Sequence, residues 1–257
     1  MNSVPIFFSI LTFVFGAVVG SFLNVCIHRL PLGKSIVRPR SRCPVCEKAI
    51  APYDNIPLLS YLILRGRCRH CGVSISPVYP AVELLTAVLS LVLFRKFGLS
   101  LPYLASFVFS AALVVVAFID LEHQIIPDVI SLPGIPLFAA AGIGIMGLTL
   151  WDSLIGILLG GGVLYLVAAG YELLKKQEGM GGGDIKLLAM IGGFLGWKSL
   201  LFVILVSSLL GAVVGLSVIL YKKGDLKYAI PFGPFLSAAA VLYLFYGEAF
   251  MRFFIYR

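Results

Sequence analysis

Long apolar runs separated by short polar stretches make up nearly the whole chain. We expect eight of these runs to form helices that cross a membrane, at residues 4–27, 79–94, 99–119, 128–150, 153–174, 185–196, 200–221 and 229–250. A helix needs about 20 apolar residues to cross the hydrocarbon core of a bilayer. The run 185–196 is short by that measure, so seven spans remain an alternative to eight. The pattern predicts an all-α polytopic membrane protein.

The composition supports this prediction and excludes other classes. Of the 257 residues, 60% are hydrophobic and 12% are charged, whereas a soluble domain carries about 25% charged residues. The chain has too little polar surface to cover a water-soluble globule. A disordered chain, a coiled coil and a collagen are excluded as well, because the apolar runs recur along nearly the whole length.

One polar stretch, residues 28–77, interrupts the apolar pattern after the first run. It holds two acidic residues, Glu47 and Asp54, and these nine basic residues: Arg29, Lys34, Arg38, Arg40, Arg42, Lys48, Arg65, Arg67 and Arg69. Basic loops stay in the cytoplasm, and no Lys or Arg precedes the first run. We therefore expect an uncleaved first helix with its N-terminus outside and this loop inside, in contact with membrane lipid rather than nucleic acid.

This charge pattern divides the chain into three parts. We expect a first transmembrane helix at 1–27, a cytoplasmic loop at 28–77 and a core of about seven helices at 78–257. The numbers of Lys and Arg on the two sides are the same for seven spans and for eight, so the charges do not decide between them.

Four of the five cysteines lie in this loop in two CxxC pairs, Cys43 with Cys46 and Cys68 with Cys71, with 21 residues between the pairs. Two such pairs complete a tetrahedral four-thiolate zinc site. A loop of this size has little core of its own, so a metal ion would stabilise its fold. Four protein ligands leave no open position, which favours a structural zinc over a catalytic one. A redox-active dithiol pair is the alternative.

Charged residues inside membrane spans are costly and are therefore functional candidates. Asp120 ends the run 99–119, and Asp184 begins the run 185–196. The expected topology places both on the inside, so two carboxylates from different helices could meet at one depth. Facing carboxylates can share a proton and activate water against an amide bond. A helix cap is the alternative for Asp184, and the interpretation that we prefer for Asp128, which follows Pro127.

Three glycines, Gly181, Gly182 and Gly183, precede Asp184. They carry no side chains and allow positive φ angles, so their backbone can approach a bound peptide closely. A phosphate-binding loop is disfavoured here because no strand precedes the glycines and because Asp184 would repel an anion.

Several short motifs occur together in one order along nearly the full chain. They are Gly20-Ser21-Phe22-Leu23-Asn24-Val25, Arg29-Leu30-Pro31, the two CxxC pairs, Asn55-Ile56-Pro57 with Ser60, Tyr79-Pro80-Ala81-Val82-Glu83-Leu84-Leu85, Phe118-Ile119-Asp120, Ile126-Pro127-Asp128, and Gly181-Gly182-Gly183-Asp184 with Lys186. Together they make the chain similar to the type IV prepilin peptidases, which are membrane aspartyl proteases with a GxGD motif.

The resemblance implies a reaction and its site. Members cleave the basic leader from type IV prepilins and pseudopilins at the cytoplasmic face of the bacterial inner membrane. Many then methylate the new N-terminal amine with S-adenosylmethionine, and those with a Cys-containing first loop are typically bifunctional. Asp120 and Asp184 match the catalytic pair of the family. Gly181, Gly182 and Gly183 with Lys186 then form the loop near the substrate.

We further expect the loop 28–77 to serve methyl transfer. Gly66 precedes the second cysteine pair and allows a close backbone approach, although a simple turn is an alternative. Glu83 follows the loop and could reach the membrane boundary, although helix packing or pairing with a loop Arg competes with that role. No nucleotide-binding fingerprint marks a pocket for the methyl donor.

Two functions from other classes remain. The protein could be a membrane assembly subunit whose zinc loop docks a cytoplasmic partner. It could also be an ion-coupled transporter with Asp120 and Asp184 in the ion path. The expected placement of both aspartates at one membrane face argues against a path across the bilayer.

Overall fold

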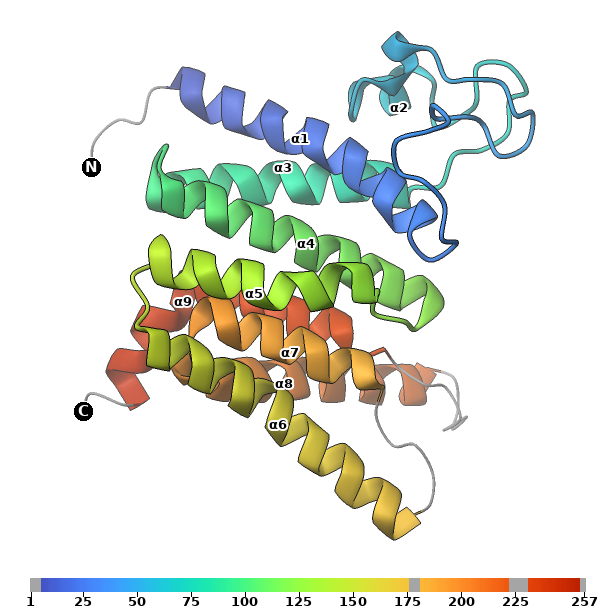
Figure 1. The fold of residues 1–257 in the computed structure, drawn as a ribbon. Helices are drawn as coiled ribbons and strands as arrows, with labels where there is room; N and C mark the ends of the chain where they lie inside the picture. The colour runs from blue at the N-terminus through green and yellow to red at the C-terminus, as the bar shows by residue number, and fades with distance from the viewer. Residues whose placement is uncertain (1–5, 176–180, 222–230, 255–257) are drawn as a thin grey trace. The chain divides into compact units, whose positions relative to one another are not determined.

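The described part of the chain, residues 6–175, 181–221 and 231–254 of a computed structural model, is helical (Figure 1). The long helices are α1 (Ile6–Arg29), α3 (Val78–Phe97), α4 (Leu101–His123), α5 (Asp128–Gly144), α6 (Leu150–Lys175), α7 (Gly182–Leu195), α8 (Lys198–Tyr221) and α9 (Gly233–Phe254). Each of the eight expected runs overlaps one of them, so the predicted all-α class is confirmed.

Among the described helices, six are long and apolar enough to cross a membrane, and α5 and α7 are shorter. The prediction for the fourth run was too long, because α5 has 17 residues and ends at Gly144. The weak sixth run forms α7, with 14 residues. At 1.5 Å per residue α7 is about 21 Å long, which is less than the hydrocarbon thickness of about 30 Å.

The polar stretch between α1 and α3 contains a 3₁₀ turn, η1 (Pro52–Asn55), and a short helix, α2 (Leu59–Ile63). The stretch predicted as a loop therefore holds two short helical elements. The Ser60 side chain explains the local order, because its hydroxyl donates to the Tyr53 carbonyl (2.9 Å) and accepts the Ile56 N–H (3.0 Å). The Ser60 side chain thus supplies hydrogen bonds to backbone groups of the segment that precedes α2.

The chain divides into two compact units, Met1–Val115 and Val116–Arg257. In the first unit α1 and α3 lie side by side (Figure 1), and glycines of α1 allow the close approach. A Cβ atom on Gly16 would lie 2.7 Å from the Ala87 Cα, and one on Gly20 would lie 2.8 Å from the Glu83 Cα. Small residues at such crossings are typical of membrane helices.

In the second unit α7 packs between α5 and α6 (Figure 1), and its residues Leu187–Phe194 are all buried. The contact with α6 is made by backbone. A Cβ atom on Gly156 would overlap the Gly192 carbonyl oxygen, and one on Gly160 would lie 2.6 Å from the Leu188 oxygen. The close distance between α6 and α7 therefore depends on glycines.

We expect Gly156→Ala to lower the stability of the protein by about 1–3 kcal/mol, because the added methyl group overpacks a backbone contact. Thermal unfolding of detergent-purified protein measures the effect. Gly162→Ala is the matched control on the same helix, since an added Cβ there meets no atom within 4 Å and Ala favours a helix by about 1 kcal/mol over Gly. Equal stability of the two variants would contradict the packing argument.

Candidate active site

Asp120 lies in the last turn of α4 and is 5% exposed. The helix ends at His123, and Gln124 adopts a φ of +55° while donating its N–H to the Asp120 carbonyl (2.9 Å). The helix thus ends one turn after Asp120, whose side chain is buried although residues 121–125 are exposed.

The Asp120 carboxylate accepts a hydrogen bond from the start of α9. Its Oδ2 atom lies 2.9 Å from the Gly233 nitrogen. In the first turn of α9 the Phe235 and Leu236 N–H groups bond to the Phe232 carbonyl, and Pro234 has no N–H. The Gly233 N–H therefore has no hydrogen-bond acceptor within the helix, and the Asp120 carboxylate supplies one.

A side chain at position 233 would displace the Asp120 carboxylate. A Cβ atom there would lie 2.7 Å from the Asp120 Oδ2 and 3.2 Å from the Ile126 Cδ1. The sequence analysis missed this residue because it placed the eighth helix from residue 229, whereas α9 begins at Gly233. A glycine between Phe232 and Pro234 at a helix start was the available signal.

Asp184 lies in the first turn of α7, near Asp120. Ile126, in the connection between α4 and α5, lies close to the surroundings of both aspartates. A Cβ atom on Gly183 would lie 2.8 Å from the Ile126 Cβ, and one on Gly233, whose N–H bonds to Asp120, would lie 3.2 Å from the Ile126 Cδ1. The Oδ1 atom of Asp184 is buried and has no hydrogen-bond partner within the described residues. The second unit thus brings both sequence-predicted aspartates together.

The glycines before Asp184 act differently from the prediction. Gly181 is the N-cap residue of α7 with a φ of −66°, and Gly182 and Gly183 belong to the helix. Positive φ angles are found at other glycines of the described chain, so conformational freedom is not the reason for this run. Gly183 is needed for the close contact with Ile126, and Gly181 and Gly182 remain exposed. Gly181, and not Asp184, is therefore the N-cap residue.

Lys186, expected near the substrate, forms an ion pair with Asp128 (Nζ–Oδ1, 2.7 Å). The interpretation of Asp128 as a helix cap was wrong, because Pro127 is the N-cap residue of α5 and no side chain caps that helix. The ion pair links the first turns of α5 and α7 beside the aspartates. Both side chains are partly exposed, so the pair orients the helix ends more than it stabilises the fold.

The four loop cysteines converge. The Sγ atoms of Cys43, Cys46, Cys68 and Cys71 all lie within 4.8 Å of one another. Cys43 and Cys71 are 3.8 Å apart, and four Zn–S bonds of about 2.3 Å in a tetrahedron give about that separation. The residues present therefore fit a tetrahedral metal ion.

The two cysteine pairs are built alike, which the sequence analysis did not recognise as a repeat. Isolated β-bridges enclose them, Arg42 with Ala49 and Arg67 with Ser74. The residue after each second cysteine has a positive φ, 55° at Glu47 and 71° at Gly72. Each half of the site is thus the same turn.

Backbone groups prepare the first cysteine of each pair to bind a cation. Hydrogen bonds from the backbone of Cys46 and Val45 lower the pKa of the Cys43 thiol to about 6. The backbone of Cys71 and His70 lowers the pKa of the Cys68 thiol in the same way. The Cys43 thiol therefore favours the thiolate form, which is the form that binds metal, and the pKa of the Cys68 thiol is shifted in the same direction.

Gly66 and Glu83, the residues expected to serve methyl transfer, each contact the segment around α2. Gly66 has a φ of +68°, and a Cβ atom there would lie 3.0 Å from the Tyr61 ring. Glu83 is 8% exposed, and its Oε2 accepts the Leu58 N–H (2.7 Å). Glu83 therefore fastens the loop to α3, and it pairs with backbone rather than with an Arg side chain.

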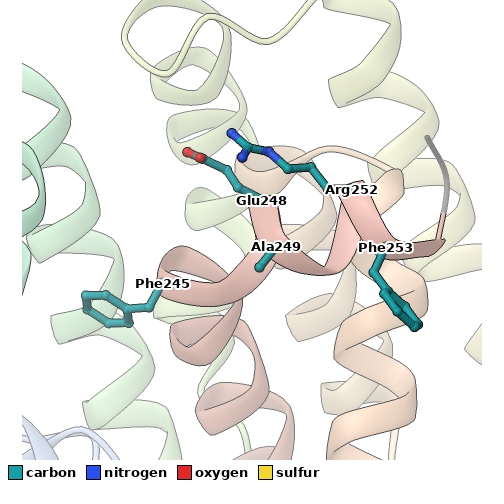
Figure 2. A pocket seen from close by; sticks show the side chains of 5 residues that line it. All are labelled: Phe245, Glu248, Ala249, Arg252 and Phe253. Carbon is teal, nitrogen blue, oxygen red and sulfur yellow. The ribbon is translucent and has the colours of Figure 1, made fainter. Parts of the chain in front are cut away.

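A pocket on α9 lies apart from these residues. It is lined by Phe245, Glu248, Ala249, Arg252 and Phe253 (Figure 2). Glu248 is 15 residues beyond Gly233, which is about 22 Å along a helix. The pocket therefore has no part in the chemistry of the two aspartates.

Two family models match the chain. Residues 14–97 match the bacterial peptidase A24 N-terminal domain, and residues 107–216 match the type IV leader peptidase family. The first match contains the four cysteines, and the second contains Asp120 and Asp184.

Curated relatives match over nearly the full length and carry the name prepilin leader peptidase/N-methyltransferase. One from Aeromonas hydrophila is 38% identical over 99% of this chain and 96% of the relative. One from Pseudomonas aeruginosa is 38% identical over 98% and 95%, and one from Myxococcus xanthus is 46% identical over 83% and 64%. No solved structure matches the chain.

Proposed function

Because the chain belongs to the type IV leader peptidase family, we propose that it cleaves the leader peptides of type IV prepilins or pseudopilins and then methylates the new N-terminal amine. The observation that carries the proteolytic half is the pair of carboxylates that the second unit brings together, Asp184 in the first turn of α7 and Asp120 in the last turn of α4. An assembly subunit or a transporter is not favoured, since the curated relatives are named as enzymes.

Asp120 and Asp184 act as an aspartyl protease dyad in this proposal. One carboxylate takes a proton from water, and the other donates a proton or a hydrogen bond to the scissile carbonyl oxygen. The Gly233 N–H holds Asp120 in place for this step. The exposed backbone of Gly181 and Gly182 lies next to Asp184 and gives an extended substrate segment room to approach. Lys186, two residues after Asp184, lies beside the same segment.

The proposed location is the bacterial inner membrane with the N-terminus outside. The loop 28–77 and Asp120 are then on one side, because α3 leads the chain away from that side and α4 brings it back. The excess of Arg and Lys in the loop supports the cytoplasmic assignment. A substrate cut there keeps its own apolar segment in the membrane and presents its new amine to the cytosol.

Zinc is the metal that we propose for the four cysteines. It is bound by four thiolates and has a structural role, since no ligand position remains for water. S-adenosylmethionine is the proposed methyl donor and would supply an electrophilic methyl group. The polar groups of Gly66 and Glu83 that the structure describes bond to the protein itself. We therefore propose that these two residues stabilise the loop, and that the loop in turn serves methylation.

We expect Asp120→Asn and Asp184→Asn each to lower the rate of leader cleavage by about 10²–10⁴-fold, the usual contribution of an acid–base group. Incubation of detergent-purified enzyme with a prepilin, followed by mass spectrometry, measures the loss of the leader. Glu248→Gln, an exposed carboxylate on α9, is the control and should cleave normally. Near-normal cleavage by either Asp variant would refute the dyad.

The hydrogen bond from Gly233 gives a second prediction. Gly233→Ala should lower kcat for cleavage by about 10²-fold with little change in KM, because the added methyl group displaces the Asp120 carboxylate. In an Asp120→Asn background the same substitution should add little, since the two residues act through one contact. Gly144→Ala, where an added Cβ meets no atom within 4 Å, is the control. Full additivity of the two losses would show that Gly233 acts elsewhere.

The metal site predicts one zinc ion per chain in protein purified without chelator. Elemental analysis should show that Cys→Ser at Cys43, Cys46, Cys68 or Cys71 removes it, whereas Cys26→Ser keeps it, because Cys26 is buried in α1. Loss of zinc should reduce methylation more than cleavage, since the dyad does not depend on the loop. Equal zinc in the quadruple variant would rule the site out.

A further inference from the structure

A row of polar side chains joins α1 to α3 where both helices meet the cysteine loop. The Ser21 hydroxyl donates to the Glu83 carboxylate. One turn along α1, the Asn24 Nδ2 donates to the Tyr79 carbonyl (3.0 Å). One further turn along, the His28 ring stacks on the Tyr79 ring, with centroids 4.8 Å apart. These positions, spaced by three and four residues, share one face of α1.

Two atoms in this row lack partners. Asn24 is 3% exposed, and its Oδ1 atom is enclosed without a hydrogen-bond partner among the residues that the structure describes. The Nε2 atom of His28 is in the same state. Buried polar atoms are rarely left unpaired. Asn24 and His28 are four residues apart on one face of α1, so their side chains are neighbours. Asn24 contacts the Tyr79 carbonyl and His28 contacts the Tyr79 ring.

The chemistry of these atoms restricts what can bind between them. The Asn24 amide nitrogen is already used, so only its acceptor oxygen remains. A neutral imidazole nitrogen also accepts. An anion would be repelled by the Asn24 oxygen and by the nearby Glu83 carboxylate. The Arg29 guanidinium does not fill the site, because it donates to the Ser35 and Pro39 carbonyls. A ligand that offers two hydrogen-bond donors on one atom can therefore satisfy both side chains.

We propose that Asn24 and His28 bind the primary amine at the new N-terminus of the cleaved substrate, with its N–H groups donated to the Asn24 Oδ1 and the His28 Nε2. The proposal rests on the methylation proposed above, for which this amine is the acceptor. Glu83 is a positioning residue in the same row, since it holds Ser21 on α1 and Leu58 in the loop. The cysteine loop is thereby fixed beside the amine.

The test measures peptide binding without a methyl donor. Detergent-purified full-length protein is titrated with a fluorescent peptide that has the pre-cleaved N-terminus, and with the same peptide acetylated at its amine. We expect the free amine to bind about tenfold more tightly than the acetylated form, as one or two hydrogen bonds provide. His28→Phe keeps an aromatic ring on Tyr79 but removes Nε2, and should abolish most of this preference. Asn24→Leu should do the same.

A second readout uses turnover. Both variants should raise KM for the amine peptide in methylation about tenfold, while leader cleavage stays within about twofold of the unmodified protein. Thr12→Val is the control, because Thr12 is a buried polar residue of α1 whose hydroxyl bonds within its own helix. A variant that fails to fold is detected by its loss of leader cleavage, and His28→Phe then decides.

The outcomes separate the two proposals. An unchanged preference for the free amine in His28→Phe, or equal binding of both peptides to the unmodified protein, overturns the amine site and leaves an enclosed water as the occupant. A protein that cleaves but never methylates its product overturns the proposed methylation, whatever the peptides do.

Discussion

The candidate site depends on a short helix that is buried on all sides. The residues Leu187–Phe194 of α7 are enclosed by the second unit, and the helix is about 9 Å shorter than the hydrocarbon thickness. Glycine contacts with α6 and the Gly183–Ile126 contact fix where α7 begins. These contacts therefore also fix the position of its first turn, with Asp184, within the second unit.

The cysteine loop solves a different problem. It has only short elements, η1 and α2, and its larger apolar side chains, among them Leu59, Leu62 and Ile63, are exposed. Four thiols drawn together by two equal turns replace the missing core. Arg69 adds a bidentate contact to Asp54 and keeps the pKa of that carboxyl below its usual value. The Glu83 carboxylate then ties this small assembly to α3.

Much of this organisation could be predicted from the sequence, because its signals are local. Apolar runs reveal helices, and two CxxC pairs reveal a metal site. The position of Asp120 and Asp184 at the ends of apolar runs revealed the carboxylate pair. The contact with Gly233 could not be predicted, since it joins residues 113 positions apart. The partner of Lys186 was missed for the same reason, because Asp128 is distant in sequence and its local context suggested a cap.

The hydrogen bond between Gly233 and Asp120 has a consequence for how the protein can evolve. The same carboxylate oxygen closes the first turn of α9 and takes part in the proposed chemistry. One atom of Asp120 thus contributes both to the stability of α9 and to the proposed catalysis. In many enzymes, by contrast, the catalytic groups lower the stability of the fold. Selection to keep the helix would preserve Asp120 even in a descendant that no longer cuts any substrate. Persistence of this aspartate alone is then poor evidence of activity, and Asp184, whose buried oxygen has no such structural duty among the described residues, is the better marker.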